Sequence, residues 1–240
     1  MNDETKQIAD SFRCKYTVFE KGTDPDLVEQ AYLKAYELGK KEGFCPAIVC
    51  LNEYVGPLLQ EMEKEGYNIQ DEIAKCQDNG KEILEERFQE YTECFDEDEL
   101  IDFIGEETEG EEVTNFIGCC SYEDGTLEAD TLLLEIPVKN PWEVVAYIPL
   151  GGWNEYPATD DMLAICKYWY KKYNAVPAAF TNDVMEFYAP SGLNGVDSLE
   201  AAKEHYGFCS DRVDQGTQTY KLSELAAGLE KSKVWYFWWD

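Results

Sequence analysis

The sequence has 240 residues, of which 44% are hydrophobic and 14% aromatic, so it can bury a sizeable core and is not a disordered composition. Its formal net charge of -30 argues against binding to nucleic-acid phosphates or anionic membranes, and it suits a basic protein partner or bound cations. Acidity that serves only solubility is the other interpretation. The first residues contain no apolar segment of a signal peptide, and no run approaches the about 18 apolar residues of a membrane span. We therefore expect a soluble cytoplasmic protein that binds neither nucleic acid nor a membrane.

Nine cysteines and a single histidine restrict the chemistry further. No Cys-x-x-Cys motif occurs, and one histidine cannot complete the usual Cys/His zinc patterns. We interpret the cysteines as reduced and mostly buried, with a regulatory disulfide as the less favoured alternative. The sequence therefore predicts no metal and no cofactor.

Helices and strands alternate in the first third of the chain. Residues 1–14 are polar and predicted to fray, and 15–19 favour a short strand. Asp24 can cap a helix that has proline at its first position. The apolar run 44–51 predicts a buried strand, and Asn52 can cap the helix after it. This order indicates a small α/β portion at the N-terminus.

A strongly acidic segment follows a weaker helical stretch. Residues 68–95 have apolar residues at helical spacing, whereas 95–112 contain ten acidic residues and no basic one. Asp96, Asp98 and Asp102 resemble part of a calcium-binding loop, but the glycine of an EF-hand turn is missing. We favour a solvated acidic connector.

A change of composition after this connector predicts two domains. Residues 1–112 would form an α/β region with the connector, and 113–240 an α+β domain. Three short runs rich in β-forming residues predict strands at 116–122, 131–138 and 143–150.

Helices and a hairpin follow in the rest of the chain. Thr159, Ser198 and Ser223 are each placed to cap a helix, and the turn at 181–183 predicts a hairpin. The aromatic segment 233–238 predicts a last strand that is either central or lines a pocket. The predicted fold class is α+β, with a mixed sheet and flanking helices in the C-terminal half.

A glycine-rich turn at 151–154 is the first candidate binding site. Its two glycines allow close backbone approach to a ligand, and Asn154 offers both a donor and an acceptor. The alternative is a tight turn in which Trp153 fills the core. No Walker or GxGxxG motif is present, so a phosphate loop is not indicated.

The polar segment 211–216 is the second candidate site. Its carboxylates could converge with Asp240 if the segment packs on the last strand, and paired carboxylates can exchange protons or hold a hard cation. The alternative is turn chemistry, in which the aspartates cap and a glycine takes a positive φ. The full set of candidate binding residues is Trp153, Asn154, Asp183, Asp211, Asp214, Gln215, Trp238 and Asp240.

His205 and Cys209 lie four residues apart on one predicted helix face. A Cys–His pair is geometrically possible there. We favour packing of His205 in the core, because it falls on an apolar stripe.

Several motifs carry a resemblance to a bacterial family named domain of unknown function 4253, over about residues 132–240. The motifs are Asn140-Pro141-Trp142-Glu143, Gly151-Gly152-Trp153-Asn154-Glu155-Tyr156-Pro157, Thr181-Asn182-Asp183, Tyr206-Gly207-Phe208-Cys209-Ser210-Asp211, Val213-Asp214-Gln215-Gly216-Thr217 and Trp235-Tyr236-Phe237-Trp238-Trp239-Asp240, together with Trp169 and Tyr173. The family has no established activity, so the resemblance implies no particular chemistry. Many members have cysteine where this chain has Tyr156, which argues against a nucleophilic cysteine at that position.

Three functional hypotheses follow. The first is a non-enzymatic interaction protein whose acidic surface binds a basic partner, such as a toxin bound by a bacterial immunity protein. The second is a small-molecule-binding or hydrolytic enzyme with its site between the 151–154 turn, the 211–216 segment and the last strand. The third is a purely structural role. No catalytic residue is identified.

Overall fold

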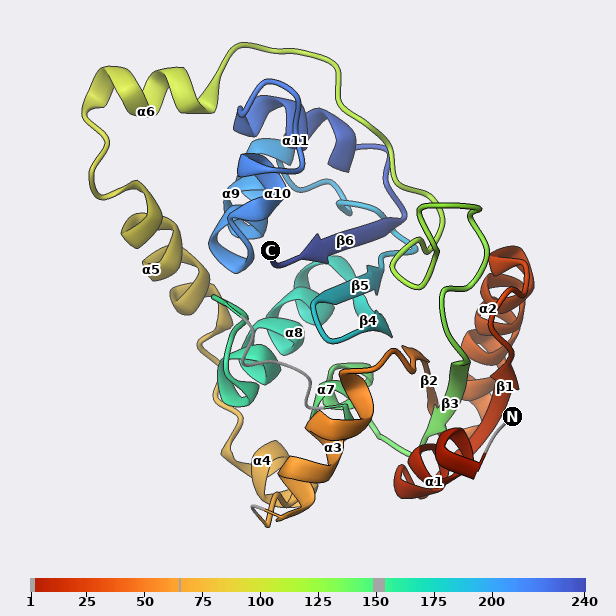
Figure 1. Ribbon diagram of the computed structural model, residues 1–240. Helices are drawn as coiled ribbons and strands as arrows, with labels where there is room; N and C mark the ends of the chain where they lie inside the picture. Colours follow the sequence, from red (N-terminus) through yellow and green to blue (C-terminus); the bar gives the residue numbers. More distant parts are fainter. Residues whose placement is uncertain (1–2, 65, 149–153) are drawn as a thin grey trace.

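The computed structural model describes residues 3–64, 66–148 and 154–240. Helices surround a central sheet, and the predicted α+β class is confirmed (Figure 1). None of the described helices is both long and apolar enough to cross a membrane. The elements in chain order are α1 (Asp3–Ser11), β1 (Lys15–Phe19), α2 (Pro25–Glu42), β2 (Cys45–Cys50), α3 (Val55–Lys64), α4 (Ile69–Lys75), α5 (Gly80–Thr92), α6 (Glu97–Ile104), β3 (Thr131–Ile136), η1 (Pro141–Glu143), α7 (Val144–Tyr147), α8 (Thr159–Tyr173), β4 (Val176–Phe180), β5 (Val184–Tyr188), α9 (Ser198–Phe208), α10 (Asp211–Asp214), α11 (Leu222–Leu229) and β6 (Val234–Trp238).

The described strands form one mixed sheet in the order β1-β3-β2-β4-β5-β6. Neighbouring strands are antiparallel except β2 and β4, which run parallel with Ile48 opposite Ala179. The predicted hairpin is confirmed as β4 and β5. Because β6 lies at an edge of the sheet, the prediction of a central last strand is wrong. Its alternative as a pocket-lining strand is correct, since Tyr236 and Trp238 line a cavity.

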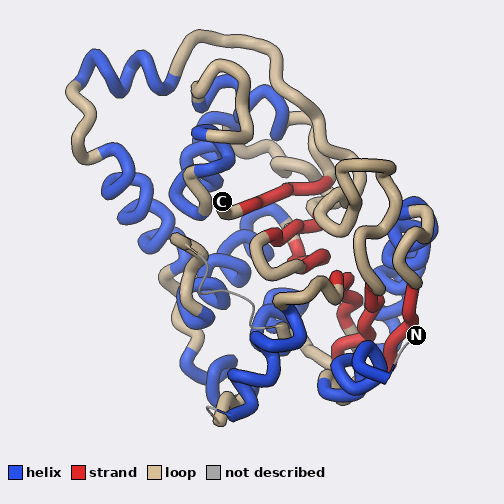
Figure 2. Tube along the Cα trace, in the orientation of Figure 1, coloured by secondary structure: helices blue, strands red, loops and turns tan. Residues whose placement is uncertain are grey.

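Different parts of the chain cover the two faces of the sheet. On one face, α2 and parts of the irregular segment 105–130 (Figure 2) pack on the strands, and the rings of Tyr32 and Phe116 meet edge to face with centroids 4.9 Å apart. The other face carries α8, α9 and most of the remaining helices. Along β2, Ile48 contributes to the first core and Val49 to the second, as the period of two requires.

Strand β3 connects the two predicted domains. It belongs to 113–240, yet it pairs with β1 and β2 on either side, and both of those strands belong to 1–112. The division into two domains stays a prediction. The shared sheet gives a physical reason to expect the two parts to depend on each other.

The N-terminal residues do not fray as predicted. Residues 3–11 form α1, and Phe12 directly after it is buried in the main core. This apolar contact anchors a helix whose polar sequence alone would not hold it.

The acidic segment 95–112 is only partly a connector. Its first half is α6, which begins with a capping box in which Asp96 and Glu99 each accept from the other's backbone N–H. Asp102 accepts from Lys221 Nζ at 2.6 Å. These carboxylates therefore serve a helix cap and an ion pair rather than a calcium loop.

Two of the predicted C-terminal strands are wrong, whereas the third is confirmed as β3. Residues 144–147 form α7, because Asn140 and Glu143 form a capping box that starts a helical turn. Residues 149 and 150 lie outside the described part. Segment 116–122 is irregular apart from an isolated bridge between Cys120 and Leu127, because other groups take up its backbone N–H donors.

The helix caps are partly as predicted. Asp24 accepts from Asp26 N, and Asn52 accepts from Val55 N at the start of α3. By contrast, Thr159, Ser198 and Ser223 lie inside the helices that they were expected to cap, and the caps are residues 158, 197 and 221.

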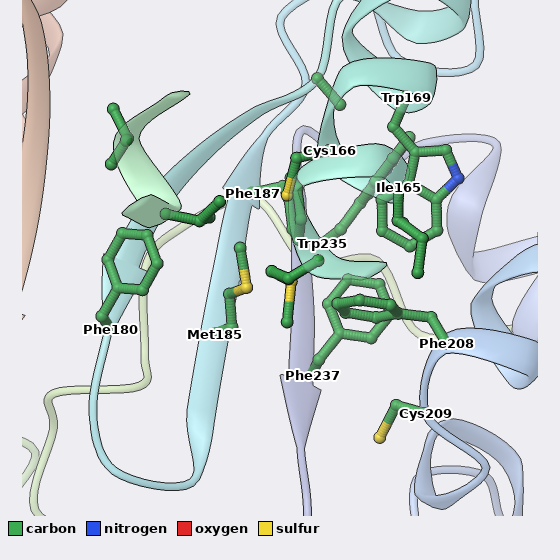
Figure 3. Close-up of a cluster of buried hydrophobic side chains, with 14 of the residues drawn as sticks. Ile165, Cys166, Trp169, Phe180, Met185, Phe187, Phe208, Cys209, Trp235 and Phe237 are labelled. Carbon is green, nitrogen blue, oxygen red and sulfur yellow. The ribbon is translucent and has the colours of Figure 1, made fainter. Parts of the chain in front are cut away.

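An aromatic cluster forms the centre of the main core (Figure 3). Trp169 on α8 is fully buried and stacks on Phe237 of β6 with ring centroids 5.6 Å apart. Phe208 on α9 meets Phe237 edge to face at 4.7 Å. The aromatic C-terminal strand is thus held by its inward face, although it lies at the sheet edge.

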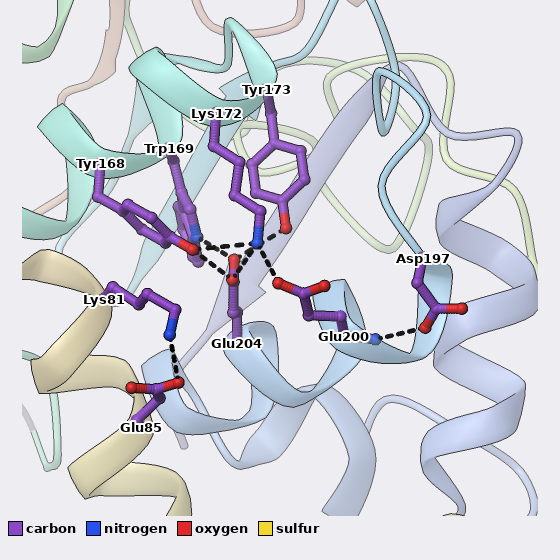
Figure 4. A network of polar contacts seen from close by, with 9 residues as sticks. All are labelled: Lys81, Glu85, Tyr168, Trp169, Lys172, Tyr173, Asp197, Glu200 and Glu204. Carbon is purple, nitrogen blue, oxygen red and sulfur yellow. Dashed lines mark hydrogen bonds and ion pairs between the residues drawn. The ribbon is translucent and has the colours of Figure 1, made fainter.

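A buried carboxylate, Glu204, joins α9 to α8 (Figure 4). Its Oε1 accepts from Tyr168 Oη at 2.8 Å and from Lys172 Nζ at 2.7 Å. Its Oε2 accepts from Trp169 Nε1 at 3.0 Å and from Tyr173 Oη at 2.9 Å. All four donors lie on α8, so one side chain fixes the position of both helices. The four hydrogen bonds, one of them from an ammonium group, offset the cost of removing this carboxylate from water.

Glu204→Ala should lower the free energy of unfolding by about 3 kcal/mol, because Lys172 would lose its buried partner and three neutral donors would lose their acceptor. Glu200→Ala is the matched control. Glu200 also contacts Lys172, at 2.6 Å, but its side chain is 52% exposed, so the loss should stay below about 1 kcal/mol. Urea unfolding of both variants gives the comparison. Equal losses would contradict the role assigned to Glu204.

A fragment of residues 113–240 should lack the cooperative unfolding of the whole chain. Without β1 and β2, both edges of β3 lose their hydrogen-bond partners and its apolar face is exposed. Thermal unfolding followed by circular dichroism measures this, with the full chain as reference. Mixing in a fragment of residues 1–112 should restore the transition. An isolated fragment that unfolds at the midpoint of the full chain would show that the shared sheet is dispensable.

Candidate functional site

A cavity of about 690 Å³ lies where strands β2 and β4 end. These two strands are parallel neighbours, and the chain later continues to β3 on one side and to β5 on the other. In open sheets, ligands bind outside the carboxyl ends of parallel strands where the connections diverge in this way. We call this cavity the strand-end pocket. Segment 117–122 and the end of β6 complete its wall.

Two asparagines connect the strand ends at the pocket. Asn52 Nδ2 donates to Asn182 Oδ1 at 2.5 Å, and its Oδ1 accepts from Tyr54 N and Val55 N. One side chain therefore ties the end of β2 to the β4–β5 turn and starts α3.

The β4–β5 turn holds Asp183 in a defined position. Thr181 Oγ1 donates to Asp183 Oδ1 at 2.8 Å and accepts from Val184 N at 2.9 Å. Trp238 Nε1 donates to Asp183 Oδ2 at 3.3 Å, and the backbone N–H of Trp239 donates to Asp183 O at 3.0 Å. The Asp183 carboxylate and the Trp238 indole thus lie side by side at the pocket wall.

The pocket lining carries an excess of negative charge. Glu53, Glu128, Asp130 and Asp183 contribute carboxylates, and Lys21 contributes an ammonium group. Within the described residues, none of the four carboxylates is in an ion pair. Their hydrogen bonds come from neutral donors: Asp130 accepts from Lys21 N at 3.0 Å, and Glu128 accepts from a thiol at 3.5 Å. The pocket therefore presents uncompensated negative charge.

Large exposed hydrophobic side chains belong to the lining of the pocket. Tyr54, Ile117 and Tyr122 all line it and are 55%, 49% and 98% exposed. Burial raises the pKa of Tyr236, and the neighbouring Tyr122 phenol raises it further, so the two side chains lie close together. Large exposed aromatic residues around a concave site are typical of binding surfaces.

A buried glutamate supports the pocket wall from behind. Glu186 on β5 is fully buried, and its two carboxylate oxygens accept from Ile117 N at 2.9 Å and Gly118 N at 3.1 Å. A Cβ on Gly118 would lie 2.6 Å from Val184 Cγ1, so only glycine fits at this close approach. Burial raises the pKa of Glu186 to about 7, and the two backbone hydrogen bonds only partly oppose it.

Comparison with known proteins identifies the C-terminal part of the chain. Residues 132–240 match the model of the family Domain of unknown function (DUF4253). The resemblance inferred from the sequence motifs is thereby confirmed. No curated protein and no solved structure matches the chain.

The DUF4253 match includes only part of the pocket. Asp183 and Trp238 lie inside residues 132–240, whereas Asn52, Glu128 and Asp130 precede them. The pocket is therefore built jointly by the DUF4253 region and the residues before it.

The predicted site residues fall into separate groups. Asp183 and Trp238 line the pocket. A second cluster unites Asp211, Gln215 and Asp240: Gln215 Nε2 donates to Asp211 Oδ1 at 2.9 Å and to Asp240 Oδ2 at 3.3 Å, and Asp240 N donates to Asp211 Oδ2 at 3.1 Å. This cluster ties α10 to the end of the chain.

The remaining candidates lie elsewhere. Asp214 accepts from Tyr206 Oη at 3.4 Å, and Asn154 is exposed with φ of 43°. Neither is among the residues that line the pocket. Trp153 and the two glycines before it lie outside the described residues.

Sequence reasoning missed Asn52, Glu53, Glu128 and Asp130 as site residues. The available signal was their position: Asn52 and Glu53 directly follow a buried strand, and Asp130 directly precedes another. The parallel pairing of β2 with β4 could not be read from the sequence, so nothing brought these residues together.

The alternative of a Cys–His pair is not supported. His205 is fully buried among aromatic rings, 4.6 Å from Trp235 and 4.9 Å from Phe237 between centroids, and burial lowers its pKa well below the usual value. Cys209 Sγ donates to Trp238 O at 3.1 Å, and burial raises the pKa of the thiol to about 12. Both groups are therefore core residues, neutral at physiological pH.

The pKa of Glu186 predicts a pH dependence of stability. Below pH 4.5 the Glu186 carboxyl is protonated in both the folded and the unfolded chain, and above about pH 7 it is ionised in both. Between these values it is ionised in the unfolded chain but still protonated in the folded chain, so the free energy of unfolding falls as the pH rises. Relative to Glu186→Gln, which does not titrate at this position, the natural chain should lose about 2.5 kcal/mol of unfolding free energy between pH 5 and pH 8.

Urea unfolding of both proteins across this pH range gives the measurement. Glu123→Gln, which changes an exposed glutamate in the neighbouring loop, is the control, and its stability should run parallel to that of the natural chain. If the Glu186→Gln curve also runs parallel, the raised pKa is wrong.

Proposed function

We propose that this chain is a non-enzymatic interaction module that binds a basic protein partner through the strand-end pocket and its surroundings. The observation that carries the proposal is a set of carboxylates with no ion-pair partner among the described residues, in a pocket whose lining includes exposed aromatic side chains. Acidity that served solubility alone would need neither a cavity nor exposed apolar side chains in its lining.

The charge of the whole chain supports such a partner. A net charge of -30 generates a field that attracts basic proteins over distances comparable with the Debye length and repels nucleic acids and anionic membranes. A toxin bound by an immunity protein is an example of a partner pair with this complementarity. In such pairs, charge sets the rate and specificity of encounter, and a few buried side chains set most of the affinity.

The nucleophiles near the pocket favour binding over catalysis. Cys120 lines the pocket, and burial raises the pKa of its thiol to about 11, so the thiolate is scarce at neutral pH. The chain's one histidine is sealed in the core and is not a base available to a ligand. All nine cysteines are free, which suits the reducing cytoplasm.

Binding of octa-arginine and octa-lysine peptides to the full chain tests the proposal. Two variants with the same net charge distinguish the contribution of the pocket to peptide binding from the contribution of the overall charge of the chain. The first neutralises the pocket with Glu53→Gln, Glu128→Gln, Asp130→Asn and Asp183→Asn; the second carries Glu106→Gln, Glu107→Gln, Glu109→Gln and Glu112→Gln on the exposed acidic segment.

Affinity for both peptides should fall steeply with salt and drop at least about tenfold in the pocket variant, equal to about 1.4 kcal/mol. The acidic-segment variant should lose less than about half of its affinity, since its charges are exposed and screened. Isothermal titration calorimetry at two salt concentrations measures both effects. Salt-independent binding, or equal losses in the two variants, would refute the proposal.

A further inference from the structure

We propose that the strand-end pocket receives the guanidinium group of an arginine side chain from the partner. This inference rests on the proposed function and specifies the chemical group that the pocket recognises. Two features of the lining carry it: carboxylates from separate segments of the chain, and an aromatic ring fixed beside one of them.

The carboxylates approach the pocket from two parts of the fold. Asp183 comes from the β4–β5 turn, whereas Glu128 and Asp130 come from the segment just before β3. A guanidinium group offers five N–H donors in a planar fork and can contact carboxylates on more than one side, which a spherical cation cannot do with directional hydrogen bonds.

The two aspartates are held in place and retain acceptor capacity. In Asp183, Oδ1 accepts from Thr181 Oγ1 and Oδ2 accepts from Trp238 Nε1. In Asp130, Oδ1 accepts from Lys21 N and Oδ2 accepts from Thr5 Oγ1. A carboxylate has about four lone-pair sites, so each oxygen can accept a further donor without giving up its present bond. The protein therefore orients these carboxylates before a ligand arrives.

An aromatic surface accompanies the charge. The hydrogen bond from Trp238 Nε1 keeps the indole ring next to Asp183, and Tyr54 and Tyr122 add exposed rings to the lining. Arginine stacks on aromatic faces through its flat, weakly hydrated guanidinium, whereas lysine is a strongly hydrated point charge. Trp238 and Asp183 together thus favour arginine.

Other cations fit the lining less well. Among the described residues, no group of three His, Cys, Asp or Glu side chains is arranged to hold a metal ion. The ammonium group of Lys21 in the lining repels any cationic ligand alike, but a ligand ammonium would gain only point-charge attraction, whereas a guanidinium adds directional hydrogen bonds and stacking. The volume of about 690 Å³ is ample for a whole arginine side chain with its flanking backbone.

Titration of the full chain with three small amides tests this assignment. The probes are L-argininamide, L-lysinamide and L-citrullinamide; the last has the shape of arginine without its charge. We expect L-argininamide to bind about fivefold or more tightly than L-lysinamide, and L-citrullinamide not to bind at millimolar concentration. The measurements are isothermal titration calorimetry and chemical-shift changes of tryptophan indole N–H groups.

Matched variants locate the site. Asp183→Asn should weaken L-argininamide about tenfold, whereas Asp98→Asn on α6 makes the same charge change outside the pocket and should have less than a twofold effect. Because Asp183 also stabilises its turn, Asp130→Asn in the segment before β3 is the second variant, and thermal unfolding checks that each protein is folded. Trp238→Leu should abolish the preference for L-argininamide over L-lysinamide.

Several outcomes would overturn the inference. They are no binding of L-argininamide at millimolar concentration, equal affinity for L-argininamide and L-lysinamide, and equal effects of Asp183→Asn and Asp98→Asn. If octa-arginine and octa-lysine both bind through the pocket with equal affinity, the proposed function stands and the guanidinium assignment fails. If neither peptide depends on the pocket, both fail.

Discussion

The parallel pairing of β2 with β4 is the constraint on which the site depends. It is a short pairing, with Ile48 opposite Ala179 and Val49 opposite Phe180, yet it connects residues from the start of the chain to the DUF4253 region. Where the two strands end, their side chains meet, as the contact between Asn52 and Asn182 shows. Without this pairing, the carboxylates before β3 and the Asp183 turn would have no common wall, and the pocket would not exist.

Two buried glutamates show how differently one residue type can be accommodated. Glu204 has four donors, including an ammonium group, and it locks two helices together. Glu186 has two backbone N–H donors and no cation, so burial dominates and raises its pKa to about 7. The first carboxylate is a structural joint. The second shapes the segment that lines the pocket, and it does so at a cost in stability when it is ionised.

The sequence predicted individual helices and strands better than it predicted which distant segments contact one another. Helix α2, strand β2 and the β4–β5 hairpin follow from local signals such as the Asp24 cap and the turn at 181–183. The predictions of strands at 116–122 and 143–150 are wrong because groups outside the local pattern determine the backbone conformation. Glu186 accepts hydrogen bonds from backbone N–H groups of the first segment, and a capping box starts a helical turn in the second. For the same reason Asp183 and Trp238 could be selected from the sequence, but Asn52 and Asp130, their neighbours across the sheet, could not.

The position of the DUF4253 match within the pocket has a consequence for proteins that share only that region. The region from 132 to 240 supplies Asp183 and Trp238, a fixed half of the wall with its own hydrogen bonds. The half that contains Glu53, Glu128 and Asp130 comes from the preceding chain, which also contributes side chains to the same main core as the aromatic cluster. A protein that shares only the region 132–240 would therefore have Asp183 and Trp238 without Glu53, Glu128 and Asp130, so the complete pocket wall is a property of the full chain.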